Sequence, residues 1–191
     1  MQTQLSQKAG LMRLLTVLLC ALAAAASAAA PAAHADIIAR SSGGFTVRVE
    51  TDLPVEPAAV YAALLRPAAW WAPAHTWSGE PANLSLKGKS GACFCEALPR
   101  HGSVEHMRVV FADPSKLLRM TGALGPLQAM PVTGVMSWEM TPQGQGTRLT
   151  WTYAIGGAGP NDWAEIAPAV DAVLREQVDR FSKLVRTGSP Q

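Results

Sequence analysis

Alternation of apolar and polar side chains, together with the turn residues between segments, predicts the strands in this chain. Residues 45–50 alternate with a period of two, which is typical of a strand with one buried face. Further strands are predicted where similar segments are bounded by glycine, proline and other turn residues: 83–86, 92–98, 104–111, 116–124, 132–140 and 147–155. Their connections are too short for the crossovers that parallel strands need, so we expect an antiparallel sheet.

Helical patterns occupy two parts of the chain. After the first strand, residues 58–65 are rich in Ala and Leu and predict a short helix, and residues 68–71 predict a second. A long amphipathic helix is predicted to begin near Asp162 or Ala167 and to end near Val185. Its apolar residues share one arc of the helix: Ile166, Val170, Val173, Leu174, Val178, Phe181, Leu184 and Val185.

One polar residue, Gln177, lies inside that apolar arc. A buried amide side chain needs partners for both its donor and its acceptor groups. We therefore expect Gln177 either to hydrogen-bond to the sheet or to face a wet or ligand-filled space.

Residues 1–35 predict a cleaved secretory signal peptide. Lys8 and Arg13 supply a positive region, residues 14–26 are apolar, and Ala33-His34-Ala35 forms a small-x-small cleavage motif. A membrane anchor is the alternative, but the apolar stretch is mostly Ala, and no other segment approaches the length of a membrane span. We expect residues 36–191 to form one exported domain, periplasmic or secreted, with no membrane span in the mature form.

The net charge of the chain changes once the leader is removed. The 191-residue chain has 16 Lys and Arg residues against 14 Asp and Glu residues, and the basic excess comes from Lys8 and Arg13. Residues 36–191 carry no net charge and no cluster of basic side chains, so nothing in them predicts binding to nucleic acid.

The order of the predicted elements matches the helix-grip fold. The chain resembles the SRPBCC superfamily (polyketide cyclase, START and pollen-allergen-like proteins) in residues 47–64, in the pair Trp70-Trp71 and in residues 147–153. The resemblance implies an α+β domain in which a curved antiparallel sheet of six or seven strands wraps around the long C-terminal helix, with two short helices after the first strand. It also implies a cavity between sheet and helix, and it leaves the chemistry open, because this superfamily holds carriers, cyclases and chaperone activators.

Aromatic and methionine side chains are the main candidates for lining such a cavity. Trp151 and Tyr153 share one face of the last predicted strand, and Met136 and Trp138 share one face of the preceding strand. We expect these faces to point inward as a wall for a ligand, with core packing as the alternative for each tryptophan. The expected ligand-binding residues are Trp71, Cys93, Cys95, His106, Met136, Trp138, Trp151, Tyr153 and Gln177.

The predicted strand 92–98 carries two cysteines. Cys93 and Cys95 are expected to share one face, to point into the cavity or core, and to be unbridged, because the i, i+2 spacing on a strand separates their Cβ atoms. His106 on the next strand is expected to line the interior near them. Three interpretations stay open: an inert buried pair, a Cu(I) or Zn(II) site with His106, and a redox or disulfide pair. We predict no metal and no cofactor.

These patterns predict a function in outline only. Because no known catalytic motif occurs, we expect an exported carrier of a small apolar ligand, bound between the sheet and the last helix. One alternative is a cyclase- or hydrolase-like enzyme that uses His106 as a base. The other is a domain that binds a partner protein.

Overall fold

The computed structural model describes residues 34–159 and 163–191, and almost all of the predicted leader lies outside them. Within this part of the chain, eight strands form one antiparallel sheet in the order β1-β2-β8-β7-β6-β5-β4-β3. The strands are β1 (His34–Ser41), β2 (Gly44–Leu53), β3 (Leu84–Ser85), β4 (Cys93–Leu98), β5 (Gly102–Asp113), β6 (Leu117–Gly122), β7 (Val132–Gln143) and β8 (Gly146–Gly157).

Strand β1 is the element that the sequence pattern did not predict. Its described side chains from Asp36 to Ser41 are all exposed, so no alternation of apolar and polar positions marks it. It pairs with β2, and Ile38 is an extra residue in the register between Ile37 and Ala39. It raises the strand number above the six or seven expected.

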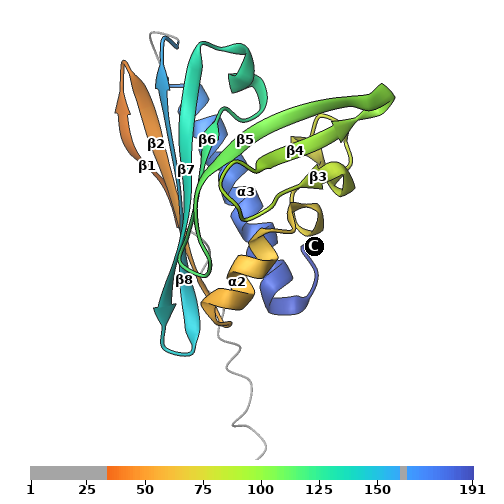
Figure 1. Cartoon of the computed structure of the whole chain (residues 1–191). Helices are drawn as coiled ribbons and strands as arrows, with labels where there is room; N and C mark the ends of the chain where they lie inside the picture. The colour runs from red at the N-terminus through yellow and green to blue at the C-terminus, as the bar shows by residue number, and fades with distance from the viewer. Residues whose placement is uncertain (1–33, 160–162) are drawn as a thin grey trace, which may run out of the picture. The chain divides into compact units, whose positions relative to one another are not determined.

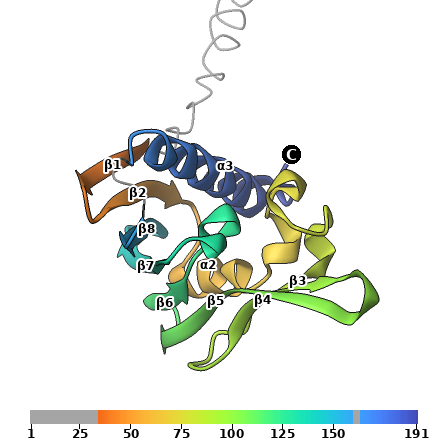
Figure 2. The same ribbon diagram turned by 90° about the horizontal axis from the view of Figure 1, so that it is seen from above.

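Two α-helices lie on the concave face of the sheet. They are α2 (Pro57–Leu64) and α3 (Ile166–Thr187), and the sheet curves around both (Figures 1 and 2). The second predicted short helix is a 3-10 turn, η1 (Pro67–Ala69), followed by a similar turn, η2 (Pro73–His75). The α+β helix-grip architecture is confirmed.

A cluster of aromatic rings fills the space between the middle of the sheet and the C-terminal half of α3. Trp70, Trp138, Trp151 and Phe181 are all fully buried. The ring centroids of Trp138 and Trp151 lie 4.8 Å apart, and those of Trp70 and Phe181 lie 5.3 Å apart. Edge-to-face contacts of this kind add to the area that each ring buries, so this cluster is the packed core of the domain.

Polar contacts tie α3 to the chain that follows η1. Gln177 is completely buried; its Oε1 accepts the backbone N–H of Ala72 at 2.8 Å, and its Nε2 donates to the carbonyl of Val173 at 3.3 Å. Arg180 Nε donates to the carbonyl of Trp70 at 2.9 Å. Gln177 thus has the two partners that burial requires, but they are backbone groups outside the sheet.

Two β-bulges in β5 change which of its side chains point inward. Phe94 and Cys95 of β4 are opposite Met107 and Glu105, so His106 is an extra residue in β5. Val110 is an extra residue opposite β6. Because a bulge interrupts the period of two, His106 and Met107 are both buried, while Val110 and Phe111 are both exposed.

Candidate ligand-binding site

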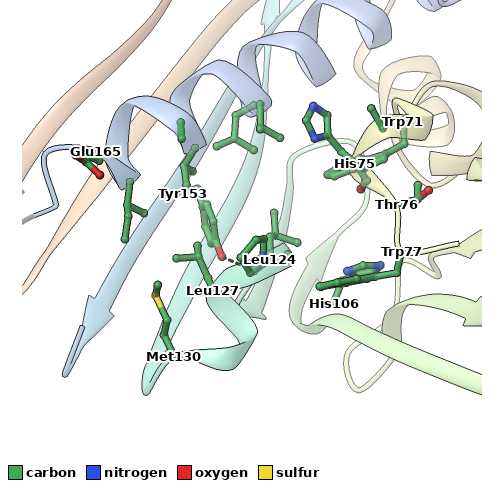
Figure 3. Close-up of a pocket in the computed structure, with 18 residues that line it drawn as sticks. Trp71, His75, Thr76, Trp77, His106, Leu124, Leu127, Met130, Tyr153 and Glu165 are labelled. Atoms are coloured by element: carbon green, nitrogen blue, oxygen red, sulfur yellow. Dashed lines mark hydrogen bonds between the residues drawn. The ribbon is translucent and has the colours of Figure 1, made fainter. Parts of the chain in front are cut away.

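A cavity of about 550 Å³ lies between the N-terminal half of α3 and the sheet (Figure 3). Four parts of the chain enclose it: the segment around η2, the segment around the 3-10 turn η5 (Gly125–Ala129), α3, and single residues of β5 and β8. The lining residues are Trp71, Ala74, His75, Thr76, Trp77, His106, Leu124, Gly125, Pro126, Leu127, Met130, Tyr153, Glu165, Ile166, Ala169, Val170, Val173 and Leu174.

Most of this wall is apolar. The helix contributes aliphatic side chains, and Ile166, Val170 and Val173 belong to the predicted apolar arc although they are only half-buried. They are half-buried because one side of each borders the cavity, although Ile166 and Val170 also pack against the core. The segment around η5 supplies the facing apolar side chains Leu127 and Met130.

Tyr153 anchors the η5 segment over the cavity. Its hydroxyl accepts the backbone N–H of Leu124 at 3.1 Å and donates to the carbonyl of Gly122 at 3.3 Å; Figure 3 shows the ring pointing from β8 toward Leu124. Burial raises the pKa of Tyr153 to about 12, so the phenol is neutral and free to donate. Gly134 makes room for the ring, since a Cβ atom there would lie 2.4 Å from Tyr153 Cε2.

The η5 segment is also attached to β5 beside His106. Gln128 Nε2 donates to the carbonyl of Glu105 at 2.8 Å. A Cβ atom at Gly122, where φ is +147°, would lie 2.7 Å from the carbonyl oxygen of His106, so the close approach of β6 to the bulge requires glycine.

A buried histidine–glutamate pair forms one side of the cavity. His106 is 5% exposed and Glu96 is 1% exposed. His106 Nε2 and Glu96 Oε2 lie 2.9 Å apart. The same carboxylate accepts the backbone N–H of Trp77 at 3.1 Å and that of Ser78 at 2.5 Å. Glu96 therefore holds both the imidazole and the loop after η2 in place.

Burial and hydrogen bonds together set the protonation states of Glu96 and His106. Burial alone raises the pKa of Glu96, but the hydrogen bonds from Ser78, Trp77 and His106 outweigh burial and hold the pKa below its ordinary value. Burial lowers the pKa of His106, although Glu96 acts in the opposite direction. At neutral pH the pair is an ionised carboxylate and a neutral imidazole. Because a carboxylate only accepts, His106 Nε2 carries the proton and Nδ1 keeps its lone pair.

The rim of the cavity is more polar and more exposed. His75 Nε2 lies 2.9 Å from Glu176 Oε2, and both side chains are partly exposed. Trp77 is 53% exposed although its backbone is fixed by Glu96. The rim can thus meet water, whereas the His106 side of the cavity is removed from it.

The structure brings three of the predicted lining residues to the cavity: Trp71, His106 and Tyr153. The others are separated from it. Met136, Trp138 and Trp151 are fully buried in the core, and Gln177 is committed to backbone groups. The period of two correctly placed these strand residues inward, but it does not distinguish a packed interior from a hollow one.

The prediction for the two cysteines was wrong in two respects. Cys93 and Cys95 form a disulfide, and they are half-buried on the face opposite Phe94 and Glu96, whose side chains point inward. The Cα atoms of Cys93 and Cys95 lie 5.3 Å apart, less than the about 6.6 Å that two residues span on a regular strand, so β4 does not keep the extended geometry that argued against a bridge. The expectation that the two side chains share one face is consistent with the bridge.

This arrangement removes the copper or zinc hypothesis for these residues. Both sulfurs are engaged in the disulfide, and His106 lies on the inner face with its Nε2 on Glu96. Within residues 34–159 and 163–191, no group of three or more His, Cys, Asp or Glu side chains could hold a metal ion.

Sequence reasoning missed Glu96, His75 and Trp77. The expectation that Cys93 and Cys95 point inward would turn Glu96 outward, but alternation places it inward once the face of the cysteines is known. His75 and Trp77 lie in a loop rich in Trp and Pro, where no periodicity indicates direction. Their role depends on the contact between that loop and β4.

Comparison with known proteins agrees with the fold. Residues 44–186 match the family model described as "Polyketide cyclase / dehydrase and lipid transport". No curated protein sequence matches the chain. Among the residues that the structure describes, no helix has the length and apolar character needed to cross a membrane.

Solved structures share the architecture at low sequence identity. CalU16 from Micromonospora echinospora is 14% identical with a TM-score of 0.52, over 81% of this chain and 85% of its own. A protein from Rhodobacter sphaeroides is 17% identical with a TM-score of 0.55, over 81% and 99% of the two chains. The Aha1 dimer from Colwellia psychrerythraea is 14% identical with a TM-score of 0.53, over 75% and 97%. At these identities the likeness concerns the fold alone.

Proposed function

Because this chain belongs to the polyketide cyclase / dehydrase and lipid transport family, we propose that it is an exported protein that binds one small apolar molecule in the cavity under α3. The observation that carries the proposal is the cavity itself. It has a volume of about 550 Å³ and lies beside a core packed with aromatic and aliphatic side chains. Clefts of a few hundred Å³ with mostly apolar walls and a few polar groups are typical of small-molecule sites.

Two features support export. The N-terminal sequence, with Lys8, Arg13 and the Ala33-His34-Ala35 motif, has the organisation of a signal peptide. The Cys93–Cys95 disulfide is the second, since disulfides persist in oxidising compartments outside the cytosol. Mass spectrometry of the protein recovered from its host tests this part: we expect a chain that begins at Asp36, and an uncleaved cytosolic chain would contradict it.

A matched pair of substitutions tests the cavity. Ala169 and Ala172 both lie on α3, but only Ala169 lines the cavity. An Ala169→Trp substitution fills the space with an indole, and we expect the affinity for an apolar probe such as 1-methylpyrene to fall at least tenfold. Ala172→Trp is the control and leaves the affinity within about twofold, because residue 172 is exposed away from the cavity.

Native mass spectrometry provides the independent measurement. Protein purified from its host is expected to carry a bound apolar molecule that the Ala169→Trp variant lacks. If unmodified protein is empty and shows no affinity for lipids or aromatic probes, the binding proposal fails.

A further inference from the structure

We propose that the cavity selects an uncharged apolar molecule that carries a hydroxyl group, and that His106 Nδ1 accepts the hydrogen bond from this hydroxyl. The inference rests on the proposed binding function and adds the chemical class of the ligand. It follows from what each polar atom around the cavity already contacts.

Contacts on two sides fix the orientation of the His106 imidazole. Its Nε2 is held at 2.9 Å from Glu96, which is fixed in turn by the backbone N–H groups of Trp77 and Ser78. The ring of His106 also packs on Phe94, with centroids 5.1 Å apart. The ring is therefore fixed on two sides. Since His106 lines the cavity and its Nε2 is engaged by Glu96, the nitrogen left to meet a ligand is Nδ1.

The protonation state of Nδ1 follows from the partner of Nε2. Glu96 is an acceptor, so the Nε2 position holds the imidazole proton and Nδ1 presents a lone pair. A histidine that is 5% exposed has little water available to it. An acceptor in that position favours a ligand that brings a donor, because a ligand without one leaves the acceptor desolvated and unpaired.

The other polar side chains that line the cavity already have hydrogen-bond partners or lie at its exposed rim. Among the lining residues that the structure describes, Tyr153 and Thr76 have their hydroxyls in hydrogen bonds to backbone groups, and Trp71 Nε1 donates to the carbonyl of His75 at 2.9 Å. His75, Trp77 and Glu165 stand at the exposed rim, where water serves their polar groups. The buried polar contact open to a ligand is His106, and it calls for one donor on an otherwise apolar molecule.

This arrangement favours recognition over catalysis. A base that removes a proton next to a carbonyl group needs a donor nearby to stabilise the negative charge that develops on oxygen. The hydroxyls that line the cavity are already used to hold the η5 and η2 segments. Thus we expect His106 to bind the hydroxyl and to leave it unchanged.

Two probes of similar shape, one with a hydroxyl group and one without, test the hydrogen bond to His106 separately from binding in the cavity. The probes are 1-hydroxypyrene and 1-methylpyrene, and their affinities are measured through quenching of tryptophan fluorescence at pH 7.5. Binding of 1-methylpyrene tests the cavity alone. The ratio of the two affinities, compared between unmodified protein and a His106→Phe variant, tests the hydrogen bond.

We expect the preference for 1-hydroxypyrene to fall about three- to tenfold in His106→Phe, which is the range that one neutral hydrogen bond supplies. His106→Gln keeps a donor for Glu96 and an acceptor oxygen, and should retain part of the preference. His101→Asn is the control: His101 is an exposed turn residue with φ +63°, a conformation that Asn tolerates, and its replacement leaves the ratio unchanged.

The outcomes are distinct. If both proteins bind 1-methylpyrene and His106→Phe leaves the ratio unchanged, the inference is overturned and the binding function stands. If unmodified protein binds neither probe, both fall.

A second measurement needs no substitution in the site, in case His106→Phe fails to fold. Nitrogen NMR of ¹⁵N-histidine-labelled protein distinguishes the two ring nitrogens. We expect the His106 Nε2–H tautomer in the free protein and a shift of Nδ1 with 1-hydroxypyrene but not with 1-methylpyrene. An Nδ1–H tautomer would overturn the inference.

Discussion

The two ends of α3 face the same sheet, but the space between helix and sheet is filled at one end and hollow at the other. Toward the C-terminus, Phe181 meets Trp70, and the rings of Trp138 and Trp151 complete a filled core. Toward the N-terminus, Ile166, Val170 and Val173 face the cavity. Gln177 lies between the two regions and attaches the helix to Ala72.

The difference comes from side-chain size and from where polar groups are satisfied. Large rings on both the helix and the sheet fill one end. At the other end the helix presents smaller aliphatic residues, while the η5 and η2 segments are held away from it by hydrogen bonds to Tyr153 and Glu96. A helix-grip domain can therefore keep a stable core and an open site side by side, because different residues maintain each.

The largest effect is expected from removing a ring of the filled core. Trp151→Ala leaves a large cavity among Trp70, Trp71 and Trp138, and we expect the free energy of unfolding to fall by about 3–5 kcal/mol. Urea denaturation measures it. Trp77→Ala is the matched control, because Trp77 is 53% exposed and its loss should change stability by less than about 0.5 kcal/mol. Equal effects would contradict the division into two regions.

A smaller loss is expected at the buried pair. Glu96→Gln places an amide NH₂ group against a backbone N–H or against His106, and it should reduce the free energy of unfolding by about 1–3 kcal/mol. Glu105→Gln, which alters an exposed ion pair between two residues of β5, Glu105 and Arg108, is the control and should cost less than about 1 kcal/mol. If Glu96→Gln were as mild as its control, Glu96 would not be organising the loop.

The disulfide is expected to matter less than the buried pair. Because it closes a loop of only three residues, replacing both cysteines by serine should cost at most about 1.5 kcal/mol. The affinity for 1-methylpyrene should stay unchanged, since the sulfurs lie on the face of β4 opposite Glu96. A large loss of affinity would show that the bridge shapes the cavity.

The smallest effect is a dependence on pH. The pKa of His106 is lower in the folded protein than its ordinary value of 6.5, so the unfolded chain binds this proton first as the pH falls. Stability is then present above pH 6.5 and is lost as the pH falls toward the folded pKa. The loss is small because Glu96 partly offsets the effect of burial on His106.

Urea denaturation at pH 7.5 and pH 5.5 measures this loss, and His106→Gln should reduce it. A second decline is expected below pH 4.5, the ordinary pKa of a glutamate, because the pKa of Glu96 is lowered by folding. Stability that rose on acidification would contradict the assigned protonation of the pair.

The sequence by itself determined the architecture. The period of two and the turn residues between segments located seven strands, the period of 3.6 located α3, and the short connections favoured antiparallel pairing. These signals are local, because alternation follows from burial of one face and needs no knowledge of the partner. Strand β1 was not predicted because its described side chains are all exposed, so burial leaves no pattern in them.

Only the tertiary structure decided which inward residues border a cavity and which pack. Trp138 and Tyr153 both point inward, yet one joins the core and the other holds the η5 segment. The bulge at His106 shifts the face of β5 by one residue, and this depends on pairing with β4 across ten or more residues. The partners of Glu96 come from a loop 18 and 19 residues away in the chain. Contacts of this kind leave no periodicity in the sequence, because each depends on where distant segments meet.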